Sequence, residues 1–418
     1  MSNREDVLAA VDETRIVDLA RKVIQIPSPT HEEGRLADFF HSYMKDMGME
    51  VEFQNVGKSK QVIGKLRGDG TGRSLMFCGH MDHNVVEEND KHWTQPPYGG
   101  VIKDGWLYGV ASVNMKGPDS SMLQAIDTIR RSNVKLKGDL IFAAVCGEMV
   151  GGLGVSALIE NGIKSDAAIV GEPTQLQVIT KHAGVVKLRL STKGMTWHYC
   201  FRYLRPPPPK GVDALRKMIK IVNAMGPAMM PVKAGSWLKF KRKPGWEELP
   251  QFNVSSLDSG IGSTCDKRLV SLMPDFATIR MDFRTLPGMD EYTIKRDLEG
   301  LVRKLKKKDR DINAVVEIMG PPEYYNRPVF DASPKSRIVK AVAESHETVR
   351  GFAPEFNPSK FYFKVGGSDA SQLLKAGIET VVYGPGGEYV MTTDERIRVS
   401  DLVDATKIYA LTAAKMCT

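Results

Sequence analysis

Four short polar segments in the first half of the chain most constrain its fold, because they fall at the ends of predicted strands. They are residues 78–82 (CGHMD), 108–117 (YGVASVNMKG), 147–152 (GEMVGG) and 171–174 (GEPT). Open α/β sheets place their chemistry in the crevice at the carboxyl ends of strands. The pattern therefore predicts an α/β sheet with a polar site at one edge.

Apolar periodicity in this half of the chain alternates between helix and strand, which indicates a sheet layered by helices. Helical spacing covers 14–24, 33–47, 115–132 and 152–161. Strand-like runs cover 61–66, 74–78, 138–146 and 167–170. Glu148 and Glu172 each lie just beyond the end of a predicted strand.

A second pattern follows His182. Strand-like alternation covers 184–194, 277–284 and 314–319, and helical spacing covers 212–224 and 290–307. Two helices and about four strands in this order predict a small α+β sandwich of the ferredoxin-like type. We therefore expect a second domain that begins near residue 183.

The composition is typical of a soluble globular chain of two or three domains, with 418 residues, 42% hydrophobic and 26% charged. The sequence has no apolar run of about 18 residues, and its first residues are too polar for a signal peptide. We therefore expect no membrane contact and a cytoplasmic location. Five cysteines without paired short spacing predict reduced thiols, not a disulfide framework or a Cys-rich zinc site.

The net charge of +8 is compatible with a nucleic-acid partner, and lysines cluster at 239–243 and 304–308. In the second cluster, however, Leu301, Val302 and Leu305 interleave with the lysines as on a solvated helix face. No nucleic-acid-binding motif accompanies either cluster. We expect no nucleic-acid partner; a basic field that attracts a small anionic substrate is an alternative.

The four polar segments resemble, in order and spacing, those of the M20 family of zinc amidohydrolases and peptidases, of the acetylornithine deacetylase, succinyl-diaminopimelate desuccinylase, aminoacylase and carboxypeptidase G2 type. The resemblance covers almost the whole chain. It implies an open mixed sheet of the zinc-exopeptidase type, with an inserted ferredoxin-like lid and dimerisation domain. The catalytic domain would comprise 1–182 and 321–418, the lid domain 183–320, and the protein would be a homodimer through the lid.

The resemblance breaks at three metal-binding positions. The family's bridging Asp is Asn114, the second Glu of its Glu-Glu pair is Met149, and its C-terminal ligand His is Met391. Thioethers suit neither Zn²⁺ nor the hard ions that carboxylates select, so the second metal site is expected to be lost. The ligands of the family's other metal site correspond to His80, Asn114 and Glu172 in this chain. We expect at most one divalent ion, zinc or manganese, and a metal-free site is the alternative.

The catalytic positions implied by the resemblance are better preserved. Glu148 corresponds to the general base, and Asp82 is expected to orient the His80 imidazole through its carboxylate. His198 corresponds to a histidine that crosses the dimer interface and stabilises the oxyanion. The proline-rich residues 205–210 (RPPPPK) are expected to form a stiff extended loop after it.

The residues that resemble the family's contacts to a substrate carboxylate are Asn253, Arg284, Gly367 and Ser368. The Arg fork suits a carboxylate geometrically. Arg284 has an alternative role as an ion-pair partner of Asp282 or Asp290. Likewise, Met149 and Met391 either fill the space of the absent metal or contact the substrate.

These features predict a hydrolase of an amide-type C–N bond in a small carboxylate-bearing substrate, with Glu148 as base and a reduced, one-metal site. A metal-independent acid/base enzyme on the same fold, acting as a hydrolase, lyase or isomerase, is the first alternative. A non-catalytic pseudo-enzyme that binds a small molecule is the second.

Overall fold

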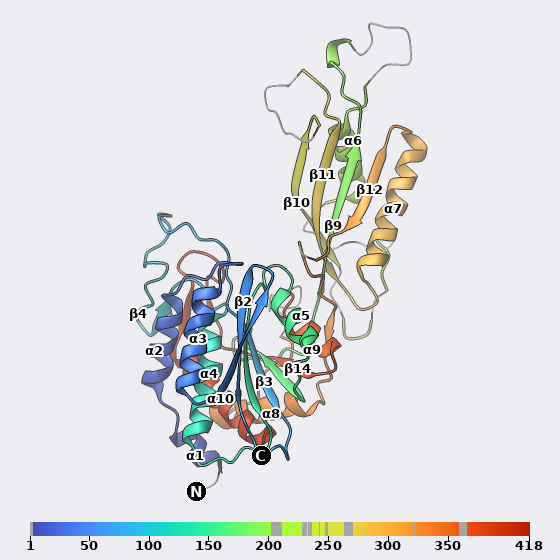
Figure 1. Cartoon of the computed structure of the whole chain (residues 1–418). Helices are drawn as coiled ribbons and strands as arrows, with labels where there is room; N and C mark the ends of the chain where they lie inside the picture. The colour runs from blue at the N-terminus through green and yellow to red at the C-terminus, as the bar shows by residue number, and fades with distance from the viewer. Residues whose placement is uncertain are drawn as a thin grey trace. The chain divides into compact units, whose positions relative to one another are not determined.

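The computed structural model describes residues 3–201, 211–227, 232, 236–241, 243–246, 250–262, 271–321, 323–358 and 366–418. The chain divides into two units, Met1–His182 with Phe330–Thr418 and Ala183–Val329 (Figure 1). The domain boundaries expected from the sequence, 182/183 and 320/321, remain predictions beside this division into units. The proline-rich segment 205–210 lies outside the described residues.

The first unit is built on a six-stranded mixed sheet. Its strands, in spatial order, are β1 (Glu50–Val56), β2 (Ser59–Leu66), β6 (Leu140–Val145), β3 (Leu75–His80), β7 (Ala167–Val170) and β14 (Glu379–Val382). The last four of these strands run parallel to one another. At one edge, β2 pairs antiparallel with β6, and β1 pairs antiparallel with β2. The predicted open mixed sheet is confirmed.

Helices cover both faces of this sheet, so its central strands β3 and β6 are buried throughout (Figure 1). One face packs on α1 (Asn3–Ala9), α2 (Glu13–Ile24), α3 (Gly34–Asp46), α4 (Lys116–Arg131), α8 (Arg337–Arg350) and α10 (Val399–Met416). The other face packs on α5 (Leu153–Glu160) and α9 (Ala370–Lys375). The helices predicted at 14–24, 33–47, 115–132 and 152–161 are confirmed within one or two residues.

Two small sheets complete this unit. The larger has the order β15 (Gly387–Glu388), β16 (Arg396–Arg398), β5 (Trp106–Tyr108) and β4 (Val101–Lys103), and it packs against α2. The smaller pairs β13 (Phe330–Asp331) with β8 (Lys181–His182). The connection from β15 to β16 carries residues 389–395, which contribute to the site described below.

The second unit is a four-stranded antiparallel sheet with two helices on one face. Its strands, in spatial order, are β10 (Gln251–Gly260), β11 (Phe276–Thr285), β9 (Gly184–Lys193) and β12 (Asn313–Ile318), and its helices are α6 (Ala214–Met225) and α7 (Glu291–Lys308). Asp213 and Asp290 cap the two helices by accepting the N–H groups of Arg216 and Thr293. The chain order β9, α6, β10, β11, α7, β12 is the predicted ferredoxin-like one. Within the described residues no helix is long and apolar enough to cross a membrane.

Candidate active site

Three parallel neighbours bring the central polar residues together, because their carboxyl ends share one edge of the sheet. β3 ends at His80, Glu148 follows β6 after a short connection, and Glu172 follows β7. All three side chains are buried, with exposed fractions of 1%, 7% and 3% for His80, Glu148 and Glu172. The site is therefore a low-dielectric one in which charges interact strongly.

His80 is held at both ring nitrogens. Its Nδ1 donates to the backbone carbonyl of Asp82 at 2.9 Å, and its Nε2 lies 3.0 Å from Oδ1 of Asn114. The direct contact is therefore to the carbonyl of Asp82, whereas the sequence suggested its carboxylate, which lies 3.6 Å from Nδ1. Burial alone would lower the pKa of His80, but the surrounding carboxylates, chiefly Glu148 and Glu172, outweigh it and raise the pKa to about 10.

The Asp82 carboxylate instead organises the turn that carries the predicted base. It accepts the N–H groups of Glu148 at 2.9 Å and Met149 at 3.1 Å. The Thr30 hydroxyl donates to it at 3.0 Å. Asp82 is fully buried, so these donors replace the water that an ionised carboxylate needs. Thr30 is a site residue that no local sequence signal indicated.

A second buried acid, Glu395, organises the loop that carries Asn114. It accepts the backbone N–H groups of Ala111, Val113 and Asn114 at 3.0, 3.0 and 2.9 Å. Burial raises the pKa of Glu395 to about 7, although these N–H groups and that of Met391 oppose the rise. Sequence reasoning missed Glu395, because it lies 281 residues from Asn114 along the chain.

Lys116 and Asp119, at the start of α4, lie buried behind the site. Burial lowers the pKa of Lys116 to about 7, and its Nζ donates to the carbonyl of Ile26 at 2.6 Å. Burial raises the pKa of the Asp119 carboxyl well above its usual range. A Cβ on Gly79 would lie 1.8 Å from Oδ1 of Asp119, so the glycine before His80 is required for close packing.

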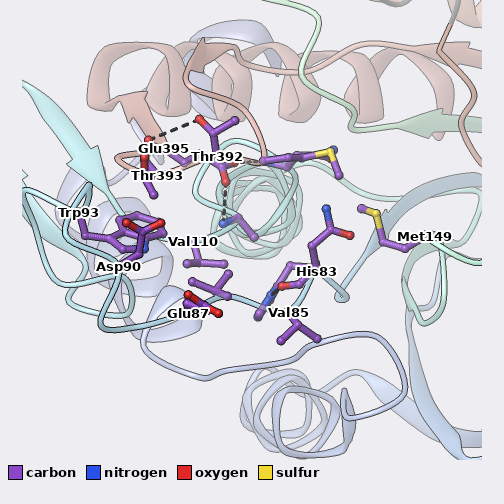
Figure 2. Close-up of a pocket in the computed structure, with 15 residues that line it drawn as sticks. His83, Val85, Glu87, Asp90, Trp93, Val110, Met149, Thr392, Thr393 and Glu395 are labelled. Carbon is purple, nitrogen blue, oxygen red and sulfur yellow. Dashed lines mark hydrogen bonds between the residues drawn. The ribbon is translucent and has the colours of Figure 1, made fainter. Parts of the chain in front are cut away.

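The three replaced metal-ligand positions line one pocket, although they come from three separate loops. Asn114, Met149 and Met391 all contact a cavity of about 250 Å³ (Figure 2). In the close-up, Met149 lies at one end of the pocket and Trp93 at the other. The structure thus brings together the residues that the sequence identified as a rewritten ligand set.

The residues present do not fit a two-metal centre. The two positions that would bind only the second ion are the thioethers of Met149 and Met391. The first position fits one ion. His80 Nε2 and Asn114 Oδ1 are 3.0 Å apart, close to the roughly 3.3 Å between ligand atoms of a tetrahedral zinc with bonds near 2 Å. In the described part of the chain, no three His, Cys, Asp or Glu residues group to hold a metal ion. An ion at this position would therefore need a further ligand of another type, and Asn114 is the candidate beside His80 and Glu172.

The residues predicted to bind a substrate carboxylate fall in both units. In the second unit, Asn253 and Arg284 line a pocket of about 400 Å³. The Arg284 guanidinium donates to the Asp282 carboxylate, from Nε to Oδ1 at 2.7 Å and from Nη2 to Oδ2 at 3.3 Å. In the first unit, Ser368, next to Gly367, bonds through its hydroxyl to Nε2 of His182 at 2.9 Å. The ion-pair alternative for Arg284 is thus realised within the chain.

His198 lies in the second unit within an exposed aromatic cluster. Its ring stacks on Tyr199 at 5.8 Å between centroids and packs on Phe201 at 4.6 Å. Tyr199 and Phe201 are both more than half exposed. An exposed aromatic cluster of this kind is typical of a contact surface.

A mixed sheet with a buried imidazole and carboxylates at its carboxyl edge, interrupted by a ferredoxin-like unit, has the architecture of the zinc-exopeptidase fold. Residues 76–415 match Peptidase family M20/M25/M40, and the chain belongs to this family. The chain is therefore an enzyme, and the non-catalytic alternative is set aside.

Relatives and solved structures extend over nearly the whole chain. It is 26% identical over 413 residues to N-formyl-4-amino-5-aminomethyl-2-methylpyrimidine deformylase of Bacillus subtilis (strain 168), covering 94% of this chain and 92% of the relative. It is 24% identical over 406 residues to succinyl-diaminopimelate desuccinylase of Hydrogenovibrio crunogenus, covering 94% and 96%. The structure of aminopeptidase PepT from Bacillus cereus ATCC 10987 superimposes with a TM-score of 0.74 at 20% identity, covering 98% and 100%.

Proposed function

We propose that the protein hydrolyses an amide-type C–N bond in a small molecule, with Glu148 as general base. The fixed position of Glu148 carries the proposal, because Asp82 holds its backbone N–H at 2.9 Å in a buried site shared with His80. The names of two relatives, a deformylase and a desuccinylase, describe removal of an acyl group and support this reaction class.

In this reaction Glu148 accepts a proton from the attacking water, whose oxygen bonds to the carbonyl carbon. The C–N bond then breaks as the proton passes to the leaving nitrogen. Asp82 fixes Glu148 through the turn and His80 through its carbonyl, so the base and the imidazole keep their relative positions. His198 remains our candidate for stabilising the oxyanion, and a homodimer formed through the second unit remains part of the proposal.

One divalent ion, zinc or manganese, would be held by His80, Asn114 and Glu172, and when bound it supplies Lewis-acid polarisation of the carbonyl. Metal-independent acid/base chemistry is the second candidate. It is favoured by the geometry of His80, because Nδ1 faces the Asp82 carbonyl and Nε2 faces Asn114 Oδ1, so both ring nitrogens meet acceptor oxygens. The protonated ring donates to Asn114 and is suited to act as a general acid.

Elemental analysis of protein purified without chelator tests this site. We expect no more than about one divalent ion per chain, because thioethers at Met149 and Met391 replace two strong ligands. Activity toward a panel of N-acyl amines is measured before and after dialysis against a strong chelator. Chelator-sensitive turnover supports the one-metal site, and turnover in metal-free protein supports the second candidate. Two ions per chain would contradict both.

A carboxylate on the substrate, bound by Asn253, Arg284, Gly367 and Ser368, is a finer part of the proposal. Because Asp282 already occupies the Arg284 fork, the arginine must exchange this partner for the substrate. Its replacement by Gln should raise KM only for substrates with a carboxylate. We further propose a cytoplasmic location, as expected from the sequence.

A further inference from the structure

The pocket beside Asn114 has the size and lining of a binding site for one small ring. Its volume is about 250 Å³, whereas an apolar cavity of about 150 Å³ already holds benzene. The side chains of Val110, Met149, Met391 and Trp93 give it an apolar lining (Figure 2). The remaining volume accommodates a short substituent on the ring.

The two methionines make this lining favourable for an aromatic ligand. A thioether sulfur is polarisable and makes favourable contacts with ring edges. The indole of Trp93 adds an aromatic face of the kind that attracts a cation. Met149 and Met391 thus give the pocket a binding chemistry that the Glu and His of a metal site lack.

The charges of the pocket select for a cation. Glu87 lines it together with Asp90, which is bonded to the exposed His92, and Glu395, which accepts three backbone N–H groups. None of its described lining residues is Lys or Arg, although the chain has a net charge of +8. His83, which also lines it, adds no positive charge, because burial and the nearby Lys116 lower its pKa to about 4.

The loop that carries these acids arranges them on one side. The Asp90 N–H donates to the carbonyl of Glu87 at 3.2 Å, and the Trp93 N–H donates to that of Asp90 at 3.1 Å. The side chains of Glu87, Asp90 and Trp93 all line the pocket. Glu87, Asp90 and Trp93 therefore face the same space.

The two loops that form the pocket are also fastened to each other. Thr94 donates from its N–H and its hydroxyl to the Asp394 carboxylate, both at 2.8 Å. Within the second loop, Tyr389 also packs on the strand that follows it, with its ring centre 5.0 Å from the Arg396 guanidinium. A wall held in this way requires little ordering on binding, which favours affinity for a small ligand.

We propose that this pocket is a substrate subsite for a small ring that carries a basic amino group, separate from the nitrogen whose bond is broken. The proposal rests on the proposed amide hydrolysis for its place in the reaction, since Asn114 and Met149 connect the pocket to His80 and Glu148. Binding of the cationic ring itself is independent of turnover.

Isothermal titration at pH 7 of the full chain with benzylammonium, benzyl alcohol and phenylacetate tests this subsite. We expect benzylammonium to bind most tightly and phenylacetate at least about tenfold more weakly, because the pocket has carboxylates but no Lys or Arg among its described lining residues. Glu87→Gln should weaken benzylammonium about two- to fivefold and leave benzyl alcohol unchanged. Trp93→Leu should weaken benzylammonium about three- to thirtyfold.

Glu88→Gln is the matched control, because Glu88 is the next residue of the same loop and does not line the pocket. It should leave benzylammonium binding unchanged. Equal binding of phenylacetate, an equal effect of Glu88→Gln, or no binding of benzylammonium would each overturn the subsite.

Titration of Glu148→Gln with benzylammonium separates this proposal from the proposed reaction. Retained binding with lost turnover supports both. Retained binding with normal turnover overturns only the role of Glu148, and lost binding in wild-type protein with intact hydrolysis overturns only the subsite.

Discussion

Asn114 removes one negative charge from the site, because its side-chain amide is neutral where the Asp implied by the resemblance would carry a carboxylate. Its side-chain Oδ1 lies 3.0 Å from His80 Nε2, and its backbone N–H donates to the Glu395 carboxylate at 2.9 Å. A neutral amide oxygen in this position is better suited to accept a hydrogen bond than to bind a metal ion. It cannot supply the negative charge that holds two dications about 3.5–4 Å apart.

Replacing Glu148 by Gln tests the base. Gln keeps the size and hydrogen-bonding capacity of the side chain but cannot accept the proton of water, so kcat should fall by about 10² to 10⁴. The melting temperature should change little. Glu160→Gln, at the exposed end of α5, is the control and should retain full activity. Near-normal turnover of Glu148→Gln would remove this residue from the mechanism.

A buried histidine away from the site predicts how stability depends on pH. Burial lowers the pKa of His346 from 6.5 to about 4, and its Nδ1 lies 2.8 Å from the Tyr383 hydroxyl. Between these two values the unfolded chain binds more protons than the folded one. Stability should therefore fall as pH decreases from 6.5 toward 4, with His346 contributing about 1 to 3 kcal/mol of the loss.

His346→Gln removes this titration and can still bond to Tyr383. Denaturant unfolding at pH 7, 5.5 and 4.5 should show a smaller loss of stability in this variant than in wild type. His92→Gln, whose ring is 67% exposed in the native chain, is the control for loss of a histidine. Parallel pH curves for His346→Gln and wild type would refute the assignment.

The turn between β6 and α5 is the element on which the base depends. Gly147 and Gly152 adopt φ values of 63° and 81°, which favour glycine. A Cβ on Gly152 would lie 2.5 Å from Nε2 of Gln372. The Asp82 carboxylate fixes the turn between these two glycines through two backbone N–H groups.

Asp82→Asn should disrupt this turn, because an amide offers one acceptor oxygen for two N–H donors and places its NH₂ against the other. We expect a loss of about 1 to 3 kcal/mol in stability, with a clear fall in kcat. Thr30→Val removes only the hydroxyl bond to Asp82 and should cost about 1 kcal/mol. An equal effect of the two substitutions on kcat would argue against the turn as the critical element.

Elements with strong periodicity were predictable, and weakly patterned ones were not. The helix at 290–307 and the strand at 184–194 correspond to α7 and β9 within one residue. β10 escaped prediction because Gln251–Gly260 is mostly polar, and its register shifts between Val254 and Ser256. β1 also escaped prediction, although Glu50–Gln54 alternates polar and apolar residues; it is an edge strand in which only Val56 is buried.

The same contrast holds within the site. His80, Glu148 and Glu172 were predictable because each belongs to a short segment with recognisable spacing. Glu395 and Thr30 were not, because their contacts join residues 281 and 52 positions apart. Only the packing of the loops shows that these contacts exist.

At the scale of the whole molecule, the fold gathers three distant substitutions into one place. Asn114 precedes α4, Met149 follows β6, and Met391 lies between β15 and β16, yet all three line the same pocket. Met149 and Met391 thereby place apolar side chains at this pocket in two positions where the resemblance implies metal ligands. The pocket is therefore consistent with a site adapted to a different occupant.

Restoring the ligand set tests adaptation against damage. The triple variant Asn114→Asp, Met149→Glu, Met391→His recreates two carboxylates and an imidazole around the pocket, and we expect it to bind a second divalent ion. If the native reaction is tuned to the present cleft, the variant should lose native activity. The second dication would attract the Glu148 carboxylate away from its role as a base and occupy the space now lined by the two methionines.

Metal content per chain and turnover of N-acyl amines, measured on the same preparations, distinguish the outcomes. Met149→Leu with Met391→Leu is the matched control, because it keeps an apolar wall without ligands and should bind no additional metal. A second ion together with a large gain in hydrolysis would identify the wild type as a damaged two-metal enzyme. No second ion in the triple variant would mean that these three positions are not the ligand set of the family. We expect a second ion with reduced native turnover, because the present pocket has the lining of a binding site for an organic group.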